Sequence, residues 1–147
     1  MEKLVLEKDE EAIYKLEVND KGEYIEFDLN DIGLGERILN ASERLEKIDG
    51  EYQQKALKIN EEEENKIERI KKQIKLDKQY ALEMREIFDS FLGEGACQKI
   101  FGDKEVYGQY NRLMEALAPH FDKMQIDSVK AKKKLIEKYS LNEKDVI

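Results

Sequence analysis

Apolar and polar residues alternate in two short segments near the N-terminus. Every second residue is apolar between residues 14 and 18, and again between residues 25 and 29. A period of two places these apolar side chains on one face of a β-strand. Gly22 lies between the segments and can take the positive φ that a hairpin loop requires. We therefore expect an antiparallel β-hairpin or meander within residues 3–29, with residues 4–6 as a candidate third strand.

From residue 34 the apolar period becomes helical. One series runs from Leu34 to Tyr52, and a second runs from Ile67 to Phe91 with Asp77 as its one polar interruption. Both alternate steps of four and three residues, which is typical of a coiled coil or a helical hairpin. The second series falls one residue later than a continuation of the first. The shift occurs within residues 60–65, which hold no apolar residue.

Two structures fit this shift. In a hairpin, residues 34–58 pack antiparallel against residues 66–92, in arms about 40 Å long. In a coiled-coil-like rod, one helix of close to 90 Å continues through residues 51–92, which contain neither Gly nor Pro. A lone rod would leave its apolar stripe exposed, so we favour the hairpin and retain the rod as the alternative.

A glycine turn then separates this region from the C-terminal helices. We expect Gly93 to be a left-handed C-cap residue, and Gly102 to close a short helix over residues 96–101. Gly95 is the third glycine of this structural turn. Asp103 is the expected cap of the next helix.

Pro119 should end or kink that next helix. Its apolar face comprises Val106, Tyr107, Tyr110, Leu113, Met114 and Leu117. A last helix, from about residue 120 to 139, has as its anchors Phe121, Met124, Val129, Leu135, Ile136 and Tyr139. The predicted fold is thus mainly α with a small N-terminal hairpin (α+β), in a single domain over residues 1–147.

The composition of the chain limits the classes of function that fit it. The 147 residues include 26 basic and 34 acidic side chains, a formal charge of −8, and a single cysteine. One cysteine forms no internal disulfide, and no apolar run approaches the roughly 20 residues that span a bilayer. An acidic chain repels phosphates, so we expect neither nucleic acid nor membrane as partner, and a cytoplasmic location. Residues 1–31 hold 11 acids and 4 bases, whereas residues 123–147 hold 4 and 7. The acidic and basic ends could attract each other within one molecule, or between two copies of the chain in a homo-oligomer. Alternatively, both ends could simply be solvated.

No catalytic, metal or cofactor constellation emerges from the residues. Residues 93–99 lack the Gly-Lys-Ser/Thr of a phosphate loop and include the acidic Glu94. Cys97 has only His120, 23 residues on, as a candidate base, so we expect Cys97 to be a packing residue. Residues 61–64 are four glutamates without the turn geometry of a calcium loop. The basic cluster at residues 130–134 lacks arginine and aromatic neighbours. We expect a non-enzymatic protein without cofactor.

Two stretches carry a resemblance to a known family. They are residues 26–39 (EFDLNDIGLGERIL) and residues 88–103 (FDSFLGEGACQKIFGD), the latter followed by Leu-Ala-Pro at 117–119. Together they resemble small proteins encoded in the tail gene clusters of phages and prophages of Gram-positive bacteria, which act as tail assembly chaperones. Leu92 departs from the commoner Phe-Gly-Glu-Gly form of the second motif. The resemblance implies binding to the tape-measure protein and help for tail-tube subunits that polymerise around it.

The residues agree with a protein-binding role. Four apolar residues follow the glycine turn and form our candidate docking surface: Ile100, Phe101, Tyr107 and Tyr110. Each could instead belong to the core. A function of a different class also fits: a phage or host regulatory or anti-defence protein that acts by coiled-coil contact with another protein.

Overall fold

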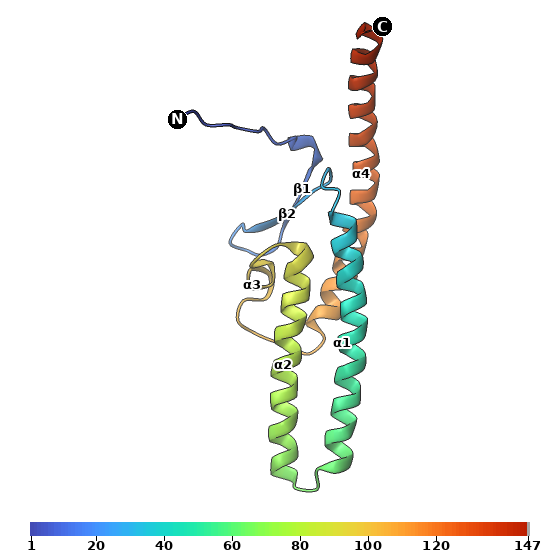
Figure 1. Ribbon diagram of the computed structural model, residues 1–147. Helices are drawn as coiled ribbons and strands as arrows, with labels where there is room; N and C mark the ends of the chain where they lie inside the picture. The colour runs from blue at the N-terminus through green and yellow to red at the C-terminus, as the bar shows by residue number, and fades with distance from the viewer. Residues whose placement is uncertain (147) are drawn as a thin grey trace.

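The computed structural model describes the backbone of residues 1–146, and the side chains of residues 1–125 with Lys133, Ile136 and Glu137. The elements are η1 (Glu10–Ala12), β1 (Ile13–Glu17), β2 (Tyr24–Asp28), α1 (Leu34–Glu62), α2 (Lys66–Leu92), α3 (Ala96–Phe101) and α4 (Gln109–Val146). Figure 1 shows α1 and α2 as a long hairpin, with the sheet and α3 at the end away from its tip. The mainly helical fold with an N-terminal hairpin is confirmed.

The sheet has two antiparallel strands. Tyr14 pairs with Phe27 and Leu16 with Ile25, so the alternating apolar residues share one face. The predicted third strand at residues 4–6 is wrong. Residues 10–12 form a 3-10 turn in place of a hairpin loop, and Asp9 caps it by accepting from the Glu11 N–H. The segment before this turn extends away from the sheet (Figure 1).

The helical hairpin is confirmed and the single rod is excluded. The chain reverses at residues 63–65, inside the apolar-free segment. Asn65 caps α2, because its side-chain oxygen accepts from the Ile67 and Glu68 N–H groups at 3.0 and 3.1 Å. The Glu63 carboxylate pairs with Lys72 Nζ at 2.7 Å. The reversal is therefore stabilised by a helix cap and an ion pair rather than by glycine.

The two apolar series play different parts in this hairpin. On α1 the predicted series does line the seam, since each of its members is buried or half-buried: Leu34, Ile38, Ala41, Leu45, Ile48 and Tyr52. On α2, Gln73 and Tyr80 contact Tyr52 of α1. These positions continue the phase of the first series. The second series lies one residue further round α2. Its Asp77 still reaches Tyr52, its Phe88 and Phe91 pack against α4, and its Ile67, Ile70 and Ile74 are exposed.

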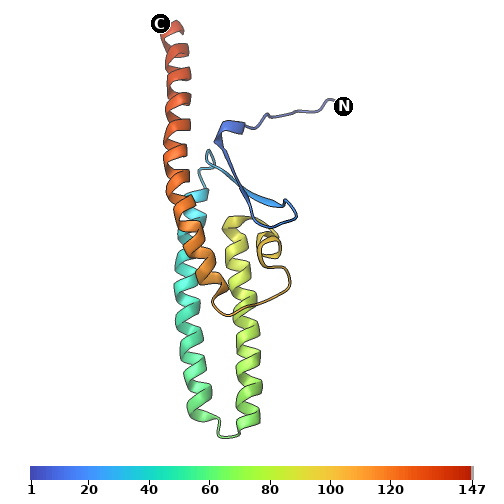
Figure 2. The ribbon, with the colours of Figure 1, turned by 180° about the vertical axis from the view of Figure 1, so that it is seen from behind.

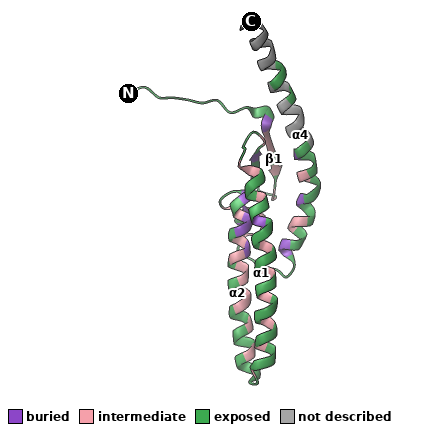
Figure 3. Cartoon of the chain, turned by 45° about the vertical axis from the view of Figure 1, so that its right-hand side comes forward, coloured by how far each residue is buried: buried purple, intermediate pink, exposed green. Residues whose placement is uncertain are grey.

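The core lies where β2, the end of α2, α3 and the start of α4 meet. Its buried members include Ile25, Phe27, Met84, Ile87, Phe88, Phe91, Leu92, Ala96, Cys97, Tyr110, Leu117 and Met124. Figure 3 shows buried residues near the sheet and α3, while the distal half of the hairpin is coloured half-buried and exposed. Burial is thus concentrated at one end of an elongated molecule.

Glycines set the turns around α3. Gly93 ends α2 with φ 114° and ψ 154°, so its φ is positive as expected but its conformation is not left-handed helical. The left-handed residue is Gly95, with φ 75° and ψ 5°, immediately before α3. Gly102 follows α3 with φ 66°. The positive φ angles at these three positions explain why the turns around α3 contain glycine.

The helix that we expect Asp103 to cap begins only at Gln109, so Val106 and Tyr107 lie in the α3–α4 loop. Asp103 caps no helix; its carboxylate accepts from Gln98. The Gln109 side chain reaches back to accept from the Val106 N–H at 2.8 Å, which satisfies a loop donor at the helix start. This local bond fixes the helix boundary.

Pro119 does not end a helix. It lies inside α4, whose first turns are inclined to the rest (Figure 2), which agrees with the predicted kink. Leu117 and Met124 are buried on either side of the proline, so core packing holds the helix through it. Ile136, an expected anchor, is exposed. Val129, Leu135, Tyr139 and the basic side chains of residues 130, 132 and 134 lie outside the described side chains.

Gly95→Ala should lower the free energy of unfolding by about 1–2 kcal/mol, because only glycine takes the left-handed conformation without cost. Gly50 is the matched control: it lies inside α1 with nothing near its missing Cβ. Gly50→Ala should raise stability by about 0.5–1 kcal/mol. Urea unfolding measures both, and a stabilising Gly95→Ala would contradict the turn geometry.

Candidate functional site

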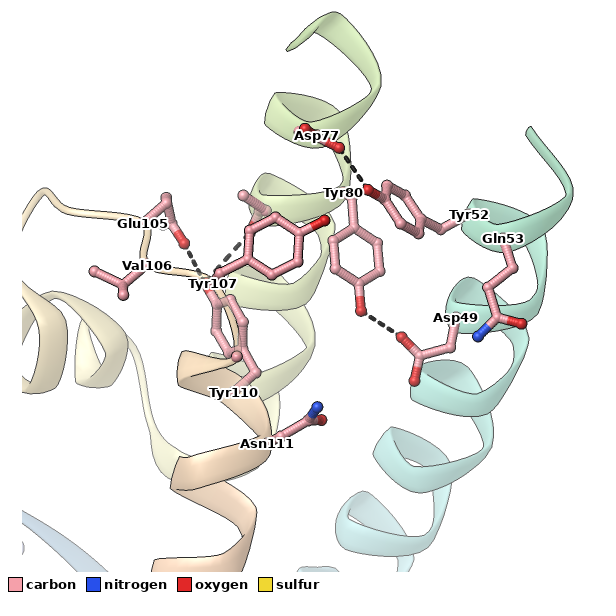
Figure 4. A pocket seen from close by; sticks show the side chains of 12 residues that line it. Asp49, Tyr52, Gln53, Asp77, Tyr80, Glu105, Val106, Tyr107, Tyr110 and Asn111 are labelled. Atoms are coloured by element: carbon pink, nitrogen blue, oxygen red, sulfur yellow. Dashed lines mark hydrogen bonds between the residues drawn. The ribbon is translucent and has the colours of Figure 1, made fainter. Parts of the chain in front are cut away.

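A pocket of about 550 Å³ opens where α1, α2 and the α3–α4 loop meet. We call it the tyrosine pocket, because four tyrosines and three carboxylates line it (Figure 4): Tyr52, Tyr80, Tyr107, Tyr110, Asp49, Asp77 and Glu105. Gln53, Ala81, Val106, Gly108 and Asn111 complete the lining.

Two tyrosine–carboxylate pairs brace α1 against α2. The Tyr52 hydroxyl of α1 donates to Asp77 of α2 at 2.6 Å, and the Tyr80 hydroxyl of α2 donates to Asp49 of α1. Gln73 Nε2 donates to both Tyr52 and Asp77. The Tyr52 and Tyr80 rings lie 4.5 Å apart between centroids. Reciprocal polar bonds and ring contact therefore fix the helix spacing where the apolar core ends.

Burial, together with these bonds at Tyr52 and Tyr80, raises the pKa of three pocket tyrosines and keeps them protonated. Burial, and then the hydrogen bond to Asp77, raises the pKa of Tyr52 above its usual range. Burial and the bond to Asp49 raise the pKa of Tyr80 in the same way. Burial raises the pKa of Tyr110 to about 12. The pocket thus presents neutral hydroxyl donors beside its carboxylates.

Arg85 of α2 organises the α3–α4 loop. Its guanidinium donates to Glu105 and to the Gly102 carbonyl, both at 3.0 Å. Glu105 also accepts from the Tyr110 hydroxyl at 3.0 Å and from Gln109 at 2.6 Å. The loop is therefore tied at both ends, and Tyr107 protrudes from it with 88% of its surface exposed.

The predicted docking residues do not form one surface. Tyr107 is exposed at the pocket, and Tyr110 is a buried wall of the same pocket. Ile100 and Phe101 are half-buried on α3, with the Phe101 ring 5.3 Å from Tyr110 between centroids. Any substitution of Phe101 or Tyr110 would therefore disturb the core.

Sequence reasoning missed the α1 and α2 walls of the pocket. One signal was present: Asp77 interrupts an otherwise apolar series. A carboxylate at such a position requires a polar partner, and Tyr52 and Gln73 provide it. The position of Asp77 in the sequence did not indicate that its partner Tyr52 would come from the other helix of the hairpin.

The other candidates for chemistry have structural environments. Cys97 is buried, as expected, and burial raises the pKa of its thiol. His120 is half-buried in α4, and its Nδ1 and the Tyr14 hydroxyl form a hydrogen bond at 2.7 Å. Among the described residues, no three His, Cys, Asp or Glu side chains gather as a metal site requires. No helix in the described part of the chain is long and apolar enough to cross a membrane.

An apolar strip continues from the pocket towards the hairpin tip. We call Leu57, Ile67, Ile70 and Ile74 the arm stripe. Their exposed fractions are 60%, 65%, 50% and 50%. On α1, Leu57 lies one turn beyond the pocket residue Gln53. On α2, Ile74 lies three residues before the pocket residue Asp77, and Ile70 lies seven residues before it. Residues three or four apart share a helix face, so the stripe extends both pocket walls.

The fold and this surface define a class: a mainly helical protein with a braced helical hairpin and an exposed apolar arm. The chain belongs to the family of unknown function DUF6673, whose model matches residues 21–145. No curated protein and no solved structure matches the chain.

The tyrosine bonds predict a loss of stability at alkaline pH. The pKa values of Tyr52, Tyr80 and Tyr110 are raised in the folded state, so the unfolded chain loses these protons first, near pH 10. Stability from these groups should be complete below about pH 10 and should fall as pH rises above it. Urea midpoints at neutral pH and at about pH 11 measure the effect. A Tyr52→Phe/Tyr80→Phe double variant should show a smaller alkaline loss; an unchanged loss would contradict this assignment.

Proposed function

We propose that this protein is a non-enzymatic binding protein that holds a helical protein client against its arm. The observation that carries the proposal is the apolar surface formed by the arm stripe with Val106 and Tyr107, all of which are exposed. Contiguous apolar surface of this kind marks interaction sites in soluble proteins.

The surface is not needed for the core. The core lies at the other end of the molecule, around Phe88 and Leu117, and the tyrosine bonds separate it from the arm. Full burial of each large aliphatic side chain is favourable by roughly 1.5–3 kcal/mol, which a client could recover. The chain is 41% charged, which would keep a complex with an apolar client in solution.

The more specific proposal is a phage tail assembly chaperone that binds the tape-measure protein and assists tail-tube assembly. Its support is the resemblance of residues 26–39 and 88–103 to that family. Such a protein would work in the cytoplasm of the bacterial host. A helical client with apolar stripes, which aggregates when uncovered, suits the arm surface.

Tyr107→Asp should weaken binding of the purified tape-measure protein by about tenfold or more, because an exposed aromatic anchor is lost. Glu62→Lys at the hairpin tip should change affinity little, since single exposed charges contribute little. Size-exclusion binding and fluorescence anisotropy compare both variants with the parent, and circular dichroism checks that both remain folded. If the parent chain does not bind the tape-measure protein, the chaperone proposal fails and the regulatory or anti-defence alternative takes its place.

A further inference from the structure

We infer that the arm stripe is the docking site for one amphipathic α-helix of a partner protein, and that acidic residues border one edge of that helix. The inference rests on the proposed function for the existence of a helical client. It adds the shape of the docked element and the sign of its charge.

The chain itself indicates that a helix fits this face of α2. The series that includes Ile70 and Ile74 continues through Phe88 and Phe91. There α4 covers it: the Phe88 ring lies 5.2 Å from Tyr110, and the Phe91 ring lies 6.4 Å from Phe121. The same helix face is therefore packed by a helix at one end and bare at the other.

The uncovered length suits a short helix. Helix α4 begins at Gln109 beside the tyrosine pocket and runs away from the hairpin tip (Figure 1). The bare face ends at Ala81, where the Tyr110 hydroxyl of α4 donates to the Ala81 carbonyl at 3.4 Å; from Ile67 to this point α2 advances 14 steps, about 21 Å at 1.5 Å per residue. An added helix of about four turns would extend the layer that α4 starts.

The charged residues beside the bare face of α2 indicate the sign of charge along one edge of the partner helix. Lys71, Lys75 and Lys78 each follow a position of the bare face by one residue, on the side of α2 away from α1. Lys75 and Lys78 form no ion pair with any described residue, and Lys71 has only an exposed pair with Glu68 at 3.6 Å. The opposite border on α1 carries the uncharged Gln53 and Asn60, and the carboxylate of Asp49 on this side already accepts from the Tyr80 hydroxyl. Acidic residues on the α2 edge of the partner helix would meet the unpaired ammonium groups of Lys75 and Lys78, and that of Lys71 beside Glu68.

Two synthetic peptides test the inference with the full chain. Both are helical, about four turns long, with the same leucine stripe; one has three glutamates along one edge and the other has three lysines. Fluorescence anisotropy should show the glutamate peptide binding about tenfold or more tightly, with a preference that shrinks as salt increases. The Lys71→Glu/Lys75→Glu/Lys78→Glu variant should reverse the preference.

Ile70→Asp should weaken the glutamate peptide by about tenfold or more, whereas Ile32→Asp should not. Ile32 is the matched control, because it is a fully exposed isoleucine in the loop before α1. Circular dichroism checks that both variants fold.

Each other outcome has a definite meaning. Equal affinity for the two peptides, binding of neither, or no reversal in the triple variant would overturn the inference. A dimer in sedimentation that Ile70→Asp dissociates would assign the face to a second copy instead. If the peptide ranking holds but the tape-measure protein does not bind, only the chaperone proposal fails. If the tape-measure protein binds and Ile70→Asp has no effect on it, only this inference fails.

Discussion

The structure depends on how helix α2 divides its surface between α1 and α4. One face of α2 meets α1, through side chains that include Gln73 and Tyr80. A second, adjacent face runs from Ile67 to Phe91 and is apolar except at Asp77, but α4 packs on it only near its end, at Phe88 and Phe91. The covered part becomes the core, and the uncovered part becomes the arm stripe. A single apolar series on α2 thus contributes both to the core and to the arm stripe. The residue at which α4 begins decides where one part ends and the other starts.

The tyrosine pocket marks the boundary between these two parts. Apolar packing ends there, so hydrogen bonds must hold the helices at a fixed distance. Tyr52 with Asp77 and Tyr80 with Asp49 do so across the hairpin, and Arg85 with Glu105 fixes the loop that leads into α4. The arm beyond the pocket is therefore a pre-organised surface, and a client helix would not have to bear the full cost of ordering it.

The sequence predicted much of the fold because the deciding signals were local. The apolar-free segment at residues 60–65 located the reversal, and Gly93, Gly95 and Gly102 located the turns around α3. Prediction from the sequence failed where contacts between residues far apart in the chain decide the structure. Core packing around Leu117 and Met124 carries α4 through Pro119, and the Gln109 bond to Val106 sets the start of that helix. Of the candidate site, Tyr107 and Tyr110 were identified, but the walls from α1 and α2 required knowledge of which faces meet.

The central claim is that the two ends of one apolar series differ in burial. Chemical unfolding of Ile70→Ala and Met84→Ala, the same kind of truncation in the same helix, tests it most directly. We expect the free energy of unfolding to fall by less than about 1 kcal/mol for Ile70→Ala and by about 2–5 kcal/mol for Met84→Ala. Equal and large losses at both positions would contradict it, because Ile70 would then belong to the core.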